Sequence, residues 1–120
     1  MPITQEVILD DDNLLRRVVF LDPNHIKEDG TPTSLAFKWN EDEDGLSVDV
    51  ERLTTYEQAL LKRERYRLFR FKAKHPRFLQ LECVHNPQED NYAHALIIGK
   101  CTKAIARNLA ANSVRIPYPD

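Results

Sequence analysis

Polar side chains that could do chemistry fall beside the expected ends of strands. The candidate catalytic residues are Arg17, His25, Ser47 and His94, with Ser34 and Lys100 as further members of the same set. Arginine holds anions, histidine transfers protons near neutral pH, and serine acts as a nucleophile when a base activates it. Because sites are commonly built from loops and strand ends, this pattern predicts a small enzyme as one of two functional hypotheses.

A second candidate site is the segment from Gly99 to Lys103, where an expected strand meets an expected helix. The first amides of a helix lack intrahelical partners and its N-terminus carries partial positive charge. Lys100, Thr102 and Lys103 therefore form a candidate anion or phosphate site. The upstream half of a phosphate-binding loop is missing, so nucleotide hydrolysis is not implied. The alternative is an ordinary capped helix with solvated lysines.

Metal-binding patterns are weak in this sequence. Asn40, Asp42, Asp44 and Glu51 follow the spacing of an EF-hand calcium loop, but both flanks favour strands where that motif needs helices. Four residues have the right type for zinc but match no compact spacing: Cys83, His85, His94 and Cys101. We therefore expect no bound metal and no cofactor.

Charge is distributed unevenly along the chain. Residues 1–51 carry a net charge of −9, residues 52–77 carry +7, and residues 78–120 are balanced. The basic segment contains seven candidate contact residues, namely Arg63, Arg65, Arg67, Arg70, Lys72, Lys74 and Arg77. They interleave with Tyr66, Phe69 and Phe71, and arginines beside aromatics are typical of single-strand nucleic-acid binding.

This basic segment supports the second functional hypothesis, a non-enzymatic binding module. Its partner would be a nucleic acid or an acidic protein. The alternative is that the basic segment neutralises the acidic half of the same chain, which an isoelectric point near 6.1 favours. The sequence alone leaves both alternatives open, and it leaves the oligomeric state undetermined.

The hydrophobic pattern predicts the elements that must position these residues. Alternating apolar residues indicate strands, and helical spacing after a capping residue indicates helices. Strands are expected over 14–21, 34–39, 46–51, 66–71, 78–84 and 94–98, and helices over 55–65 and 102–111. The second and third strands would form a hairpin with an acidic tip. Thr54 and Glu57 match the capping box of the first helix.

This order of elements predicts an α+β fold with a single antiparallel or mixed sheet and about two helices packed on it. Length favours one domain over 1–120, with an extended arm over 1–13 and a tail over 114–120. The apolar run from His94 to Ile98 should lie inside the sheet. Ile97 or Ile98 and Leu109 should be buried, whereas Lys103 and Arg107 should be exposed.

Composition and missing motifs narrow the function classes. Three glycines are too widely spaced for dinucleotide-binding or phosphate-binding loops, and two cysteines are too few for a disulfide framework. No apolar run can span a bilayer, and no signal peptide is visible. The expectation is a cytoplasmic protein with reduced thiols and no membrane partner.

Several short stretches also suggest a family resemblance across roughly residues 14–110. They are Leu14-Leu15-Arg16-Arg17, Asn24-His25-Ile26-Lys27 with Asp29-Gly30, Ser34 with Phe37, Leu46-Ser47-Val48, and His94-Ala95-Leu96 with Gly99-Lys100. On these residues the chain resembles a family of small bacterial proteins of uncharacterised function, which implies a bacterial, stand-alone cytoplasmic domain. Through Arg17 and Ser47 it is also faintly similar to small ADP-ribosyltransferase-like toxins, which implies an enzymatic site whose catalytic acid has no clear position.

Overall fold

The chain folds around one antiparallel sheet, as shown by a computed structural model that describes residues 5–19, 24–40 and 43–117. Its strands are β1 (Asn13–Val19), β2 (Leu46–Val50), β3 (Tyr66–Lys72), β4 (Glu82–His85), β5 (His94–Ile98) and β6 (Val114–Ile116). They are ordered β4-β5-β2-β1-β3-β6, and each neighbouring pair is antiparallel. The predicted α+β class and single sheet are confirmed.

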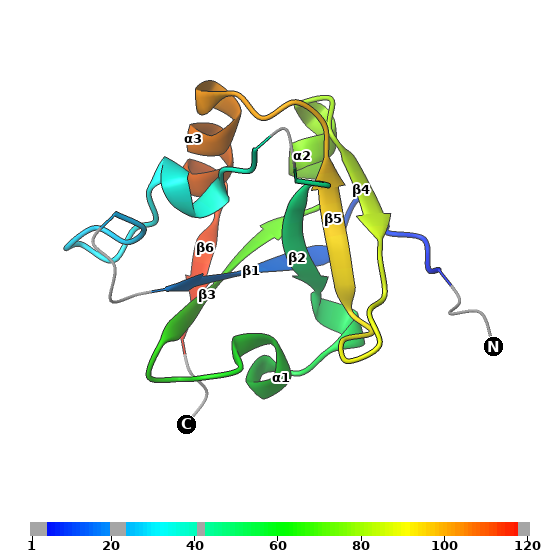
Figure 1. Cartoon of the computed structure of the whole chain (residues 1–120). Helices are drawn as coiled ribbons and strands as arrows, with labels where there is room; N and C mark the ends of the chain where they lie inside the picture. Colours follow the sequence, from blue (N-terminus) through cyan, green and yellow to red (C-terminus); the bar gives the residue numbers. More distant parts are fainter. Residues whose placement is uncertain (1–4, 20–23, 41–42, 118–120) are drawn as a thin grey trace.

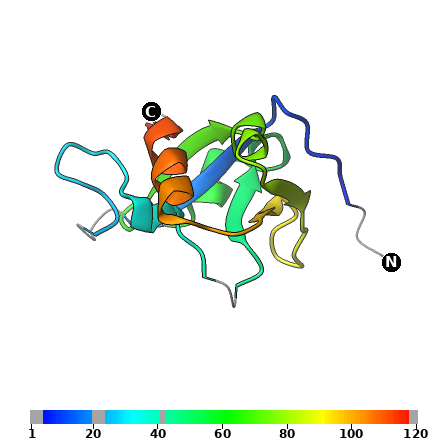
Figure 2. The ribbon, with the colours of Figure 1, turned by 90° about the horizontal axis from the view of Figure 1, so that it is seen from above.

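Short helices accompany the sheet. They are α1 (Tyr56–Leu60), α2 (Lys74–Phe78) and α3 (Lys103–Asn112), with 3-10 turns η1 (Ser34–Phe37) and η2 (Glu51–Leu53). Thr102 caps α3, because its hydroxyl oxygen accepts a hydrogen bond from Ile105 N at 3.1 Å. Figure 2 shows α3 lying over one side of the sheet with η1 beside it.

The larger core lies between that side of the sheet and α3 with η1. It includes Phe37, Leu46, Phe69, Ile97 and Leu109, all fully buried or nearly so. On the other side of the sheet, a smaller core forms under α1 from Leu15, Ala59, Leu60 and Leu68. The predicted burial of Ile97 and Leu109 and exposure of Lys103 and Arg107 are confirmed.

The sheet is split between β1 and β2. These strands pair only at Leu14 with Val50 and at Leu15 with Asp49, whereas β1 pairs with β3 along its whole length. Figure 1 shows β2, β5 and β4 running crosswise to β1 and β3. The side chain of Arg16 fills the gap and donates hydrogen bonds to Ala36 O and Ser47 O, each at 2.9 Å.

Burial and the neighbouring Arg17 lower the pKa of Arg16 to about 10, so its guanidinium stays charged at neutral pH. A buried charge is tolerated here because it replaces backbone hydrogen bonds that the split removes. Hydrogen bonds from Arg16 thus stabilise the split between β1 and β2. The split opens on the side of the sheet opposite α3.

Two predicted elements are wrong in type or length. Residues 34–37 form the 3-10 turn η1 and not a strand, so the predicted hairpin is absent and β2 pairs with β1 and β5 instead. The predicted helix over 55–65 ends at Leu60, because Leu61 has a φ of 66°. Its cap is Thr55, whose hydroxyl accepts from Gln58 N at 3.2 Å, and not Thr54.

Other boundaries also shift. The strand expected over 78–84 is shorter, since Phe78 ends α2 and is 85% exposed, while β4 begins at Glu82. The expected tail over 114–120 begins with β6, which pairs with β3; residues 118–120 lie outside the described residues. In the segment expected to be an arm over 1–13, residues 5–9 have no regular secondary structure, β1 already begins at Asn13, and residues 1–4 lie outside the described part.

Candidate functional site

A cleft of about 520 Å³ opens where β1 and β2 part, and a smaller hollow of about 60 Å³ adjoins it. Arg17, Asn91 and His94 line both spaces. Ser47, Asp49 and His94 alternate with core residues along β2 and β5, so their side chains face away from α3. The remaining wall comes from η2, α1 and the loop over 86–93.

The cleft brings together three of the four predicted catalytic residues. Arg17, Ser47 and His94 all line the smaller hollow. Arg17 Nη1 donates to Ala59 O at 2.8 Å, and its guanidinium lies 5.3 Å from the centre of the Tyr66 ring. Arg17 is therefore held at the cleft by α1 and β3, with further N–H groups available to an anion.

The ring of His94 has a defined tautomer. Nδ1 lies 2.9 Å from Asn86 O, and because a carbonyl oxygen only accepts, Nδ1 carries the proton. In the neutral ring Nε2 is then an acceptor, and within the described residues it has no hydrogen-bond partner. A backbone carbonyl that fixes Nδ1–H is a common way to aim the other nitrogen of a functional histidine.

Two residues of the site, Asp49 and Asn91, were not predicted. Asp49 is only 7% exposed, and its Oδ1 accepts from Asn91 Nδ2 at 2.8 Å. It pairs with His94 across β2 and β5, so the two side chains are neighbours on one face. The sequence signal was a charged residue between Val48 and Val50 in a short strand. Asn91 lies in a polar loop that carries no such signal.

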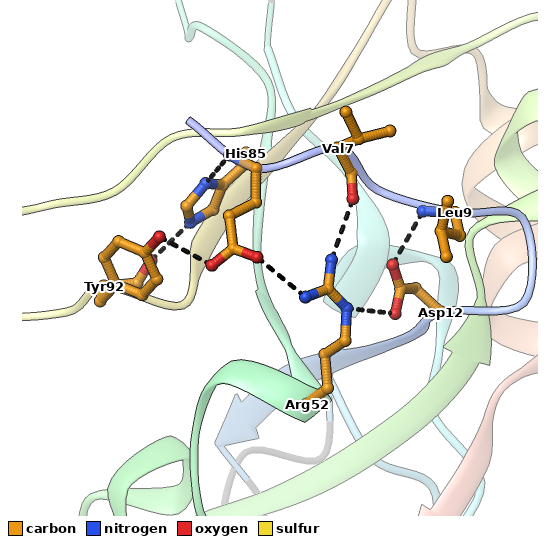
Figure 3. A network of polar contacts seen from close by, with 7 residues as sticks. Val7, Leu9, Asp12, Arg52, His85 and Tyr92 are labelled. Carbon is orange, nitrogen blue, oxygen red and sulfur yellow. Dashed lines mark hydrogen bonds and ion pairs between the residues drawn. The ribbon is translucent and has the colours of Figure 1, made fainter. Parts of the chain in front are cut away.

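The loop that forms this wall is held by the N-terminal segment, through the network in Figure 3. Tyr92 Oη donates to Glu6 at 2.7 Å, and Glu6 also accepts from Arg52 Nη1 at 3.0 Å. Arg52 in turn donates to Asp12 at 2.8 Å and to Val7 O at 2.9 Å. The hydrogen bonds from Tyr92 and Arg52 lower the pKa of Glu6.

His85 completes this network inside the molecule. It is 1% exposed; its Nδ1 accepts from Glu6 N at 2.8 Å, and its Nε2 donates to Tyr92 O at 2.6 Å. Both ring nitrogens are thus used, and the ring is neutral in this arrangement. The role of His85 is to connect the segment before β1 to the loop that lines the cleft.

The other members of the predicted catalytic set lie elsewhere. His25 belongs to the loop over 24–33, which projects on the side of η1 in Figure 1, and Ser34 begins η1 and lines a separate hollow beside α3. Lys100 lines a third hollow near Trp39. The set is therefore not collected into one site.

The candidate anion site at the start of α3 has a crowded environment. Thr102 uses its hydroxyl to cap the helix, and Lys100 shares its hollow with the acidic residues Glu43 and Asp44. Lys103 is exposed. This arrangement favours a capped helix beside a neutralised surface over a phosphate site.

The candidate calcium ligands are not gathered either. Glu51 lies beyond the far end of β2 from Asp44, where its carboxylate accepts from Arg70 and from Asn13. Asn40 N donates to Glu43, and Asp42 lies outside the described residues. The four candidate zinc ligands are likewise dispersed, and no group of three potential ligands occurs within the described residues. Burial raises the pKa of the Cys83 thiol to about 11.

Part of the basic segment is neutralised by the acidic half of the chain. Arg70 pairs with Glu51 at 2.6 Å, Arg77 with Asp10 at 2.7 Å, and Lys74 lies 3.9 Å from Asp11. Lys72 is exposed beside Lys74. The ion pairs of Arg70, Lys74 and Arg77 give no support to the prediction that this part of the basic segment contacts a partner.

The rest of the basic segment contributes Arg63, Arg65 and Arg67 to what we call the arginine cluster, at the end of the sheet where β1 ends and β3 begins. Arg17 of β1 and Arg115 of β6 complete the cluster. The Tyr66 ring lies between two of them, with the guanidiniums of Arg17 and Arg65 at 5.3 and 5.4 Å from its centre. Burial, together with Arg115 and Arg63, lowers the pKa of Arg67.

Comparison with known proteins gives no match: no family model, no curated protein and no solved structure is significantly similar to the chain. Among the described residues, no helix has the length and apolar character needed to cross a membrane. The cleft and the arginine cluster are therefore the features of the molecule that bear on its function.

Proposed function

We propose that the chain is a non-enzymatic module that binds single-stranded nucleic acid through the arginine cluster. The observation that carries the proposal is the position of the Arg17 and Arg65 guanidiniums over the Tyr66 ring, while Arg70 and Arg77 are paired with the chain's own carboxylates. Arg17, Arg65 and Arg115 form no ion pair with a carboxylate of the described residues.

Crowded like charges cost folding free energy, and the lowered pKa of Arg67 reflects that cost together with burial. A bound polyanion offsets it. Phosphates spaced along a strand suit several guanidiniums, and the planar groups of Arg65 and Tyr66 offer surfaces on which bases stack. An acidic protein would use the charges but not the stacking surface, so the aromatic centre favours a nucleic acid.

The test is the salt dependence of binding to a fluorescent 12-nucleotide RNA. Three phosphate contacts predict a slope of log affinity against log salt near −2, because each contact to a single strand contributes roughly −0.7. Arg65→Gln should weaken binding and reduce the slope by about 0.7. Arg107→Gln is the matched control, since it removes one exposed arginine from α3, away from the cluster.

Two outcomes would contradict this proposal. Undetectable affinity for RNA and single-stranded DNA at low ionic strength would remove nucleic acid as the ligand. Tighter binding of a poly-glutamate peptide than of RNA, with the same loss in Arg65→Gln, would assign the cluster to an acidic protein.

A second candidate is a small enzyme, of the ADP-ribosyltransferase-like kind that the sequence resemblance implies. The observation that favours it is that Arg17, Ser47 and His94 line one hollow. Incubation with labelled NAD and acceptor RNA or protein should then transfer label, and Ser47→Ala should abolish the transfer. Absence of transfer by the wild type would remove this candidate.

A cytoplasmic setting, as expected from the sequence, belongs to the same proposal. Both cysteines are free thiols, which the reducing cytoplasm preserves. The same compartment would supply a nucleic-acid ligand.

A further inference from the structure

We infer that the cleft binds a ribonucleotide, with the ribose cis-diol on Asp49 and His94 and the 5′-phosphate toward Arg17. This inference deepens the proposed function by naming RNA as the ligand class. Where the ligand is the end of an RNA strand and not a free nucleotide, the inference rests on that proposed function.

Two hydrogen-bond acceptors lie side by side in the hollow. Asp49 and His94 are directly opposed across β2 and β5, which places their Cβ atoms roughly 5 Å apart on one face. Asp49 Oδ1 is occupied by Asn91, and His94 Nδ1 by Asn86 O. Within the described residues, the second carboxylate oxygen and His94 Nε2 have no hydrogen-bond partners, and both residues line the hollow.

Two neighbouring acceptors require two neighbouring donors. A cationic donor would meet Arg17 and the rest of the arginine cluster, so neutral hydroxyl groups fit better. Adjacent hydroxyls on one face are the cis-diol of a ribose, and the 2′-hydroxyl distinguishes RNA from DNA. Both acceptors are oriented by the same loop, residues 86–91, and are therefore fixed before a ligand arrives.

The 5′-phosphate is placed by Arg17. Arg17 is two residues along β1 from Leu15, which pairs with Asp49, so the Cα atoms of Arg17 and Leu15 are roughly 7 Å apart. Arg17 lines the same hollow as Asp49 and His94, so its guanidinium can meet the 5′-phosphate of a ribose bound to that acceptor pair. Arg17 also belongs to the arginine cluster. The backbone of an RNA strand whose terminal phosphate binds Arg17 would therefore extend over that cluster.

The base lies in the remaining space of the cleft. The larger part of the cleft is lined by Gln58 and Gln88, whose amides can bond base edges, and by Leu53 and Leu61, which provide apolar surface. Its volume of about 520 Å³ falls within the range of small-molecule sites. The ligand is therefore a free 5′-mononucleotide or the 3′-terminal nucleotide of an RNA strand, since both present a diol and a 5′-phosphate.

The test compares ligands on the wild-type chain by isothermal titration. AMP, CMP, GMP and UMP are titrated together with their 2′-deoxy forms. At least one ribonucleotide should bind, and its deoxy form about tenfold or more weaker, because a hydrogen bond to a charged acceptor is lost. Asp49→Asn should reduce this discrimination, whereas Asp44→Asn, which neutralises an exposed carboxylate near the other end of β2, should leave it unchanged.

A second arm separates the two sources of the ligand. A 12-nucleotide RNA ending in a 3′-hydroxyl should bind more tightly than the same RNA ending in a 3′-phosphate, because that phosphate would meet Asp49. Binding of mononucleotides without this preference assigns the site to the free nucleotide.

The outcomes also separate this inference from the proposed function. Ribonucleotide binding with diol preference, but no RNA binding, keeps the inference and removes the module function. RNA binding without mononucleotide binding or 3′-end preference overturns the inference and leaves the module. Equal binding of ribo- and deoxyribonucleotides overturns the assignment to Asp49 and His94.

Discussion

Ile97 is fully buried in β5, between the neighbouring strands β4 and β2 and within the larger core. Replacing it by alanine should lower the free energy of unfolding by about 2–4 kcal/mol, because the transfer free energy is lost and a cavity remains. Chemical denaturation measures this change. Leu35→Ala is the matched control, since Leu35 is half exposed and should cost well under 1 kcal/mol. Equal costs would contradict the packing described for β5.

Residue types alone identified Arg17, Ser47 and His94 as polar groups at strand ends. Period-two alternation correctly places Asp49 on the face away from the larger core. It cannot show that the loop over 86–93 covers part of that face and makes Asp49 a buried acceptor. That information depends on long-range contacts, which neighbouring residues do not encode.

At the scale of elements, the loop over 86–93 depends on its tie to the N-terminal segment. Tyr92→Phe removes the hydroxyl that donates to Glu6. We expect amide exchange of residues 5–9 and 86–93 to become faster, because the loop loses a hydrogen bond that ties it to the N-terminal segment. Hydrogen-exchange mass spectrometry measures the effect.

Tyr56→Phe provides the control for this change. It removes a hydroxyl that donates to Ile116 O and should affect the end of β6 instead of the cleft loop. Unchanged exchange in both segments of the Tyr92→Phe protein would show that the contact does not hold the loop.

Elements marked by a dense apolar run or a clear capping residue were predicted well, and elements inferred from alternation alone were not always so. His94–Ile98 and the helix after Thr102 have the expected positions, because a dense apolar run and a capping residue specify them locally. The alternation in 34–39 was misleading, since a 3-10 turn packed on α3 also buries Phe37 and Trp39. The early end of α1 depends on Leu61 adopting a positive φ, which its residue type does not favour.

On the scale of the whole molecule, stability should depend on acidic pH. The pKa of Glu6 is lowered by hydrogen bonds from Tyr92 and Arg52. At Asp12 burial opposes ionisation, but hydrogen bonds from Arg52 and Leu9 N outweigh it and the pKa is also lowered. Groups with lowered pKa stabilise the fold above their ordinary values of 4.5 and 3.8, and this contribution is lost as pH falls below about 4.

Thermal melts between pH 7 and pH 3 test this expectation. The melting temperature should be nearly constant down to about pH 5 and then fall. Arg52→Gln should reduce the difference between neutral and acidic pH, because it removes a shared partner of both carboxylates. A melting temperature that rises on acidification would contradict the prediction that ionised Glu6 and Asp12 stabilise the fold.

The charge totals of the two halves already suggested neutralisation within the chain. They could not show which arginines would be paired, because that depends on strand register and on the path of the segment before β1. Arg70 meets Glu51 at the junction of β2 and η2, whereas Arg65 lies at the far end of β3. The division between a neutralised half and the arginine cluster is thus a property of the fold.

The split between β1 and β2 has a mechanical consequence. Within the sheet, the three-stranded ribbons β4-β5-β2 and β6-β3-β1 are joined by two residue pairs and by hydrogen bonds from the Arg16 guanidinium, and both ribbons pack on the same larger core. This seam is the shortest strand pairing in the sheet. Arg17 belongs to one ribbon, and His94 and Asp49 belong to the other. A ligand that contacts all three residues would therefore link the two ribbons. Occupancy of the cleft would then stiffen the whole sheet.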